Sequence, residues 1–106
     1  MSIIRVTVRT FQSVEHANMF VVMSEKVANE SNSTDLKINV KVIQNVDQKN
    51  QVTSIWEYDD ETHMKEVRSF LSQFNSIPNS LPPKEIAYEG EVKVSTKNKD
   101  WIMNCL

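Results

Sequence analysis

The residue types best suited to chemistry lie in one short stretch, residues 54–71, SIWEYDDETHMKEVRSFL. The ring of Trp56 could line a pocket, and the imidazole of His63 could act as a general base beside it. The acids at positions 59–61 could bind a cation, but helix capping and the helix dipole explain acids before a helix better. We therefore interpret the stretch as a strand-to-helix joint, with Trp56 and His63 as candidate catalytic residues.

The rest of the sequence adds no metal or cofactor motif. Cys105 is the only cysteine, so neither an intramolecular disulfide nor a cysteine-based zinc site is possible within the chain. His16 and His63 are predicted on separate helices, and neither belongs to an HExxH motif. The sequence also has no glycine-rich phosphate loop and no nucleophile elbow. We expect no bound metal and no cofactor.

The elements that would position these residues follow from hydrophobic periodicity. Alternation with a period of two predicts four strands, at residues 3–10, 36–43, 51–58 and 85–94. Apolar residues at helical spacing predict one helix after Ser13, which the cap and turn residues 29–35 end. They predict another helix that is capped by Asp59 or Asp60 and extends to position 74. Residues 75–84 contain Pro82 and Pro83 and are predicted to form a loop.

The predicted order is β-α-β-β-α-β, which indicates an α+β ferredoxin-like fold with two helices on one face of a four-stranded antiparallel sheet. A chain of 106 residues is expected to form one domain, residues 1–106. The loop at 45–50 lacks glycine, so a tight two-residue turn is not expected.

The opposite face of the sheet is predicted to be polar and mixed in charge. Alternation assigns Ile4, Val6 and Val8 to the other, apolar side of the first strand. The predicted polar face comprises Arg5, Thr7, Arg9, Lys37, Asn39, Lys41, Thr53, Ile55, Glu57, Ala87, Glu89 and Glu91. It could bind nucleic acid, remain solvated with cross-strand ion pairs, or pair with a second copy. The absence of aromatics on the first strand and a net charge of −2 argue against nucleic acid.

The sequence Ile55-Trp56-Glu57, followed by acids and an amphipathic helix, resembles the strand–helix joint of dimeric α/β-barrel proteins. The similarity is greatest to the antibiotic-biosynthesis-monooxygenase type. It implies a homodimer formed sheet against sheet, with a cavity in each protomer between sheet and helices. In haem-degrading members the tryptophan acts with an asparagine on the first strand and a histidine on the second helix. The first strand here has no asparagine and His63 lies in the first helical turn, so haem degradation is not expected.

We therefore expect a homodimer that binds a small apolar or aromatic molecule and has cofactor-free monooxygenase-like activity. The residues expected to line its cavity are Thr7, Trp56, Tyr58, His63 and Tyr88. The alternative is a non-catalytic homodimer whose interior is filled by side chains. The N-terminus does not resemble a signal peptide and no window approaches 18 consecutive apolar residues, so we expect a cytoplasmic protein without a membrane span. The apolar end of the chain, residues 101–106, is expected to cover the outer side of the first helix.

Overall fold

The computed structural model describes residues 2–74 and 83–96, and it has the predicted order of elements. The elements are β1 (Ile3–Thr10), α1 (Val14–Ser31), β2 (Asn39–Gln44), β3 (Gln51–Tyr58), α2 (Glu61–Leu71) and β4 (Lys84–Glu91). The boundaries differ slightly from those predicted, because β2 begins three residues later than position 36 and α2 ends at Leu71 rather than at 74. The expected packing of residues 101–106 lies outside the described residues.

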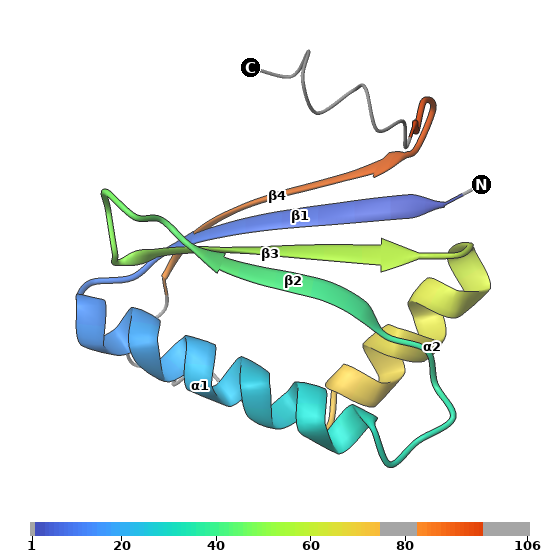
Figure 1. Ribbon diagram of the computed structural model, residues 1–106, viewed down its shortest axis with the longest axis horizontal. Helices are drawn as coiled ribbons and strands as arrows, with labels where there is room; N and C mark the ends of the chain where they lie inside the picture. The colour runs from blue at the N-terminus through green and yellow to red at the C-terminus, as the bar shows by residue number, and fades with distance from the viewer. Residues whose placement is uncertain (1, 75–82, 97–106) are drawn as a thin grey trace.

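The four strands form one antiparallel sheet in the order β2-β3-β1-β4, and both helices lie on one side of it (Figure 1). This arrangement is the predicted ferredoxin-like fold. The connection between β2 and β3 is a loop of the predicted longer kind. Asn45 Oδ1 accepts hydrogen bonds from the backbone N–H groups of Asp47 and Gln48, at 2.9 and 3.0 Å, so a side chain organises a turn that contains no glycine.

Both helices begin at capping residues. Ser13 Oγ accepts a hydrogen bond from the backbone N–H of His16 at 3.2 Å, and Asp60 Oδ1 accepts one from the backbone N–H of His63 at 2.8 Å. Asp60 is therefore the cap of α2, and Glu61 follows it in the first turn, where the helix dipole favours negative charge. These caps fix where α2 starts relative to the end of β3.

The predicted faces of β1 are wrong. Residues paired across neighbouring strands share a face, and Thr7 pairs with Ser54 while Arg9 pairs with Val52. Val52 is fully buried with Ala17 of α1, so Thr7 and Arg9 face the helices. A period of two predicts alternation but does not say which set meets the helices, and here the polar set does.

The faces of β4 are reversed in the same way, whereas the faces predicted for β2 and β3 are correct. Arg5 pairs with Glu89 and Arg9 with Glu85, which places both acids on the helix side. The side of the sheet away from the helices is therefore not the polar surface predicted. We call it the open face; its apolar residues are Ile4, Val6, Val8, Ile43, Ile55, Ile86 and Tyr88.

The buried core between sheet and helices consists of two clusters. Phe11, Phe20 and Val52 belong to the cluster under α1, and the rings of Phe11 and Phe20 lie 5.4 Å apart. Tyr58, Met64 and Val67 form the cluster under α2, with Trp56 and Leu71 packed against it. The residues at the borders of these clusters enclose the space described next.

Candidate functional site

A pocket of about 200 Å³ lies on the helix side of the sheet, between α1, β2, β3 and the end of α2. Ten of its thirteen lining residues are apolar, and three are polar. The lining residues are Arg9, Phe20, Met23, Ser24, Val27, Ala28, Ile38, Val40, Val42, Ser54, Trp56, Leu71 and Phe74. An apolar cavity with a few polar groups is the usual form of a small-molecule site.

Arg9 brings a positive charge to the wall of this pocket. Its Nη1 donates a hydrogen bond to Ser54 Oγ at 3.2 Å, and its guanidinium carbon lies 4.9 Å from the centre of the Phe20 ring. Nε lies 3.4 Å from Glu85 Oε2, an ion-pair distance, yet this buried atom makes no hydrogen bond to the described residues. Burial lowers the pKa of Arg9 and Glu85 opposes that shift, so the group stays protonated at neutral pH.

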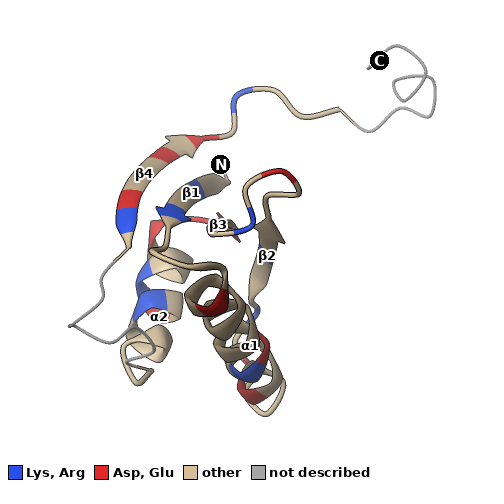
Figure 2. Ribbon diagram, turned by 90° about the vertical axis from the view of Figure 1, so that its left-hand side faces the viewer, with Lys and Arg blue, Asp and Glu red and all other residues tan. Residues whose placement is uncertain are grey.

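A second charged group ties α2 to the sheet beside Arg9. Glu89 of β4 accepts from Arg5 of β1 at 2.6 Å and also from Arg68 of α2. Figure 2 shows acidic residues along β4, with basic residues on the neighbouring β1 and α2. Tyr58 is buried next to this group, with 2% of its surface exposed. Burial raises the pKa of Tyr58 above its ordinary value, and the charge of Arg68 opposes that shift.

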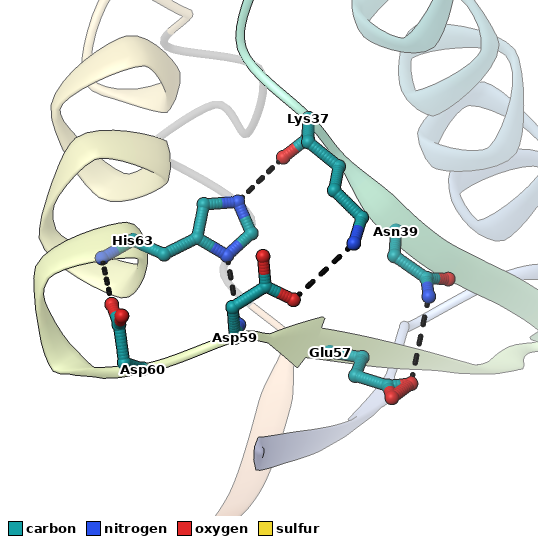
Figure 3. Close-up of polar contacts among 6 residues, drawn as sticks. All are labelled: Lys37, Asn39, Glu57, Asp59, Asp60 and His63. Carbon is teal, nitrogen blue, oxygen red and sulfur yellow. Dashed lines mark hydrogen bonds and ion pairs between the residues drawn. The ribbon is translucent and has the colours of Figure 1, made fainter. Parts of the chain in front are cut away.

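His63 is held by hydrogen bonds through both ring nitrogens (Figure 3). The backbone N–H of Asp59 donates to Nδ1 at 2.9 Å, so Nδ1 is unprotonated. Nε2 therefore carries the proton and donates to the carbonyl oxygen of Lys37 at 2.6 Å. In this arrangement the imidazole has no free lone pair with which to take a proton from a ligand.

The five residues expected to line the cavity do not all come together. Trp56 lines the pocket, and its ring stacks on that of Tyr58 with 6.5 Å between centroids. Tyr58 and Thr7 are buried on the helix side but are not among the lining residues. His63 does not line the pocket either; its ring forms a T-shaped pair with that of Tyr58, with 6.0 Å between the centroids. Tyr88 lies on the open face with 72% of its surface exposed, so the sheet separates it from the pocket.

The main site residue that the sequence analysis missed is Arg9. Alternation along β1 placed it on a solvated surface, although the pairing puts it under α1. Its sequence neighbourhood carries no signal that distinguishes a cation inside a protein from one on the surface.

Two further kinds of site are not found in the described part of the chain. Residues 2–74 and 83–96 contain no group of three or more His, Cys, Asp or Glu side chains placed to hold a metal ion. Neither described helix is long and apolar enough to cross a membrane.

No protein-family model matches this sequence, and no curated protein matches it. Solved structures with the same fold include a dimeric ferredoxin-like protein from an uncultured marine organism, with 10% identity, a TM-score of 0.71 and coverage of 92% of this chain and 93% of that one. SnoaB, a cofactor-independent oxygenase from Streptomyces nogalater, has 11% identity and a TM-score of 0.68 over 92% of this chain and 98% of its own. A NIPSNAP family protein from Agrobacterium tumefaciens has 12% identity and a TM-score of 0.60, with coverage of 86% of this chain and 92% of its own.

These similarities establish the ferredoxin-like fold. The resemblance read from Ile55-Trp56-Glu57 is therefore confirmed at the level of architecture, since SnoaB and the marine protein share that architecture.

Proposed function

We propose that this protein binds a small, mainly apolar molecule in the pocket between its sheet and its helices, and that it does so as a homodimer. The observation that carries the proposal is the pocket itself, about 200 Å³ of space walled chiefly by apolar side chains. The alternative, a homodimer with a filled interior, would have packed this space with side chains, as protein cores ordinarily are. The described residues favour the binding protein.

The pocket walls suit an aromatic or branched aliphatic group. Phe20 and Trp56 supply flat aromatic surface, and Val27, Val40 and Val42 supply branched aliphatic surface. Transfer of apolar ligand surface from water to such walls is favourable by about 25 cal/mol per Å². Shape and apolar contact would therefore provide most of the affinity, and the few polar groups would set the orientation.

The homodimer is supported by the chemistry of the open face. Ile86 and Tyr88 have 74% and 72% of their surface exposed, next to Val6 and Val8 of the neighbouring strand. A contiguous exposed apolar surface of this kind commonly marks an interface. One similar solved structure is described as a dimeric ferredoxin-like protein. We place the partner chain on this face.

A second and more specific candidate is cofactor-free oxygenase activity, supported by the similarity in fold to SnoaB. An oxygenase without a cofactor must take electrons for oxygen from its substrate, so the reacting form of the substrate is an electron-rich anion. The lining residues include no Asp, Glu or His. The substrate would therefore be acidic enough to ionise in water, Trp56 would hold its ring, and His63 would position the start of α2 rather than act as a base.

The binding proposal is tested with the fluorescence of Trp56. The sequence has two tryptophans, and Trp101→Phe leaves Trp56 as the only one. In that background we expect benzamide, a small aromatic probe, to change the emission of Trp56 in a saturable manner. Val27→Phe, which fills the pocket, is expected to abolish that change.

Val22→Phe is the matched control, because it makes the same substitution on the same helix at a residue with 63% of its surface exposed outside the pocket. It should leave the titration unchanged. Equal titrations for the two valine variants, or no saturable change in the parent, would contradict the proposal.

Oxygenase activity is assayed separately, as oxygen uptake with an ionisable phenol.

A further inference from the structure

The wall of the pocket contains a cation whose hydrogen-bonding capacity is not fully used. Buried Nε of Arg9 makes no hydrogen bond to the described residues, and the carboxylate of Glu85 lies 3.4 Å from it without the geometry of one. Leaving a buried donor unsatisfied is costly, and the cost is greater for a charged group. A ligand oxygen that reached the guanidinium from the pocket would add a charge-assisted hydrogen bond and compete with Glu85 for this cation.

Ser54 provides a second donor at the same end of the pocket. It is 2% exposed, lines the pocket, and accepts the hydrogen bond from Arg9 Nη1 through its Oγ. A hydroxyl that accepts a hydrogen bond keeps its own hydrogen to donate. Arg9 and Ser54 can thus both donate to one anionic oxygen group, while the remaining walls stay apolar except for Ser24.

Ser24 does not offer a comparable donor. Its hydroxyl already donates to the backbone carbonyl of Phe20 at 2.8 Å, within the turn of α1. The polar character of the pocket is therefore concentrated at the β1–β3 wall, around Arg9 and Ser54. A ligand that matches the pocket has one anionic end and one apolar end.

The volume limits the size of the apolar end. An apolar cavity of about 150 Å³ is sufficient for benzene. This pocket, at about 200 Å³, has room for a single substituted ring and not for a fused tricyclic system. Phe20, Val42 and Trp56 line the pocket from three different elements, α1, β2 and β3.

We propose that the pocket selects a one-ring aromatic carboxylate, with the carboxylate at Arg9 and Ser54 and the ring among Phe20, Val42 and Trp56. This inference rests on the binding function proposed above and names the ligand class. Binding would draw Arg9 away from Glu85, whose side chain is 44% exposed and can be solvated by water instead. Glu85 is therefore a competitor of the ligand for the same guanidinium.

The experiment compares three probes in the Trp101→Phe background by calorimetry and by Trp56 fluorescence. Benzoate and benzamide have nearly the same shape and differ in charge, and anthracene-9-carboxylate has the charge with a larger ring system. We expect benzoate to bind about tenfold more tightly than benzamide, because hydrogen bonds to charged groups contribute more than neutral ones. Anthracene-9-carboxylate is expected to bind far more weakly than benzoate.

Two variants locate the effect at Arg9. Arg9→Met, verified as folded by circular dichroism, should remove the preference for benzoate, while Arg5→Met, a control on the same face of β1, should keep it. Glu85→Gln should increase benzoate affinity several-fold without changing benzamide affinity, because it removes the competing carboxylate. Glu85→Gln also keeps the proposal falsifiable if Arg9→Met does not fold.

The outcomes separate this inference from the function on which it rests. Equal binding of benzoate and benzamide would overturn the anionic ligand class and leave the apolar pocket intact. Equal binding of benzoate and anthracene-9-carboxylate would overturn the size limit. Saturable binding of none of the three would overturn the binding function together with the ligand class.

Discussion

The imidazole of His63 connects three segments that are separate along the chain. It accepts from the backbone of Asp59 after β3, donates to the backbone of Lys37 before β2, and belongs to the first turn of α2. Each of these hydrogen bonds contributes a net stabilisation of about 0.5–1.5 kcal/mol. His63→Ala is therefore expected to lower the free energy of unfolding by about 1–2 kcal/mol, more than a solvated first-turn residue would.

Urea denaturation measures this loss, and His16→Ala is the matched control. His16 occupies the equivalent position after the cap of α1, and among the described residues its side chain hydrogen-bonds only with the hydroxyl of Ser13, at 3.0 Å. Its replacement is expected to cost less than about 0.5 kcal/mol, as for most partly exposed surface positions. Equal costs for the two histidines would show that the contacts of His63 do not hold the joint.

The phenol of Tyr58 gives the protein a dependence on alkaline pH. Burial raises its pKa, so the folded state favours the neutral phenol more than the unfolded state does. The stabilisation is fully present below about pH 10, the ordinary tyrosine value, and is lost as the pH rises through the folded-state pKa. Tyr88→Phe leaves Tyr58 as the only tyrosine, and the ultraviolet absorbance of its phenolate is expected to appear only above about pH 10. Ionisation below that value would contradict the assignment.

At the scale of elements, the sequence predicts which helices and strands exist, and in what order, better than it predicts which face of each strand meets the helices. Local rules that do not depend on the rest of the chain predict three features. These are the caps at Ser13 and Asp60, the longer loop after β2, which contains no glycine, and the strands with a period of two. No such rule says which side of β1 packs against the helices. The strand has an apolar side and a side with Arg5, Thr7 and Arg9, and the alternation is the same for both arrangements. The side that meets the helices depends in part on whether β4 and α2 supply charged partners for the polar side.

Those partners exist here. Glu89 and Glu85 of β4 supply opposite charges for Arg5 and Arg9 of β1, and Arg68 of α2 also pairs with Glu89. These ion pairs make the polar side acceptable under a helix. Recognising this from sequence would require the register of β4 against β1, and that register is determined by the whole sheet. The pocket was for the same reason only partly predictable: Trp56 was expected in it and Arg9 was not.

At the scale of the whole molecule, reversal of the two strands changes the basis for dimerisation. The sequence predicts a dimer through a polar sheet face of mixed charge, whereas the structure has an open face with Ile4, Val6 and Val8 at its centre and Ile86 and Tyr88 at its β4 edge. Burial of that surface removes apolar area from water on both chains at once. The helices lie on the other side of the sheet (Figure 1), and so does the pocket, so the proposed dimer and the proposed ligand would occupy different surfaces.

Ile86→Glu is the substitution that tests the dimer. Ile86 is 74% exposed in one chain, so a glutamate there is compatible with a folded protomer but would place an unpaired charge in the apolar interface. Light scattering at micromolar concentration should give the mass of two chains for the parent and of one for the variant. Val46→Glu is the control, since Val46 is 82% exposed in the β2–β3 loop, away from the sheet.

Arg5→Glu is expected to give a contrasting result, because Arg5 faces the helices and pairs with Glu89. It should lower the stability of the protomer rather than dissociate the dimer. A parent that scatters as a single chain, or an Ile86→Glu variant that keeps the mass of two, would rule out this face as the interface.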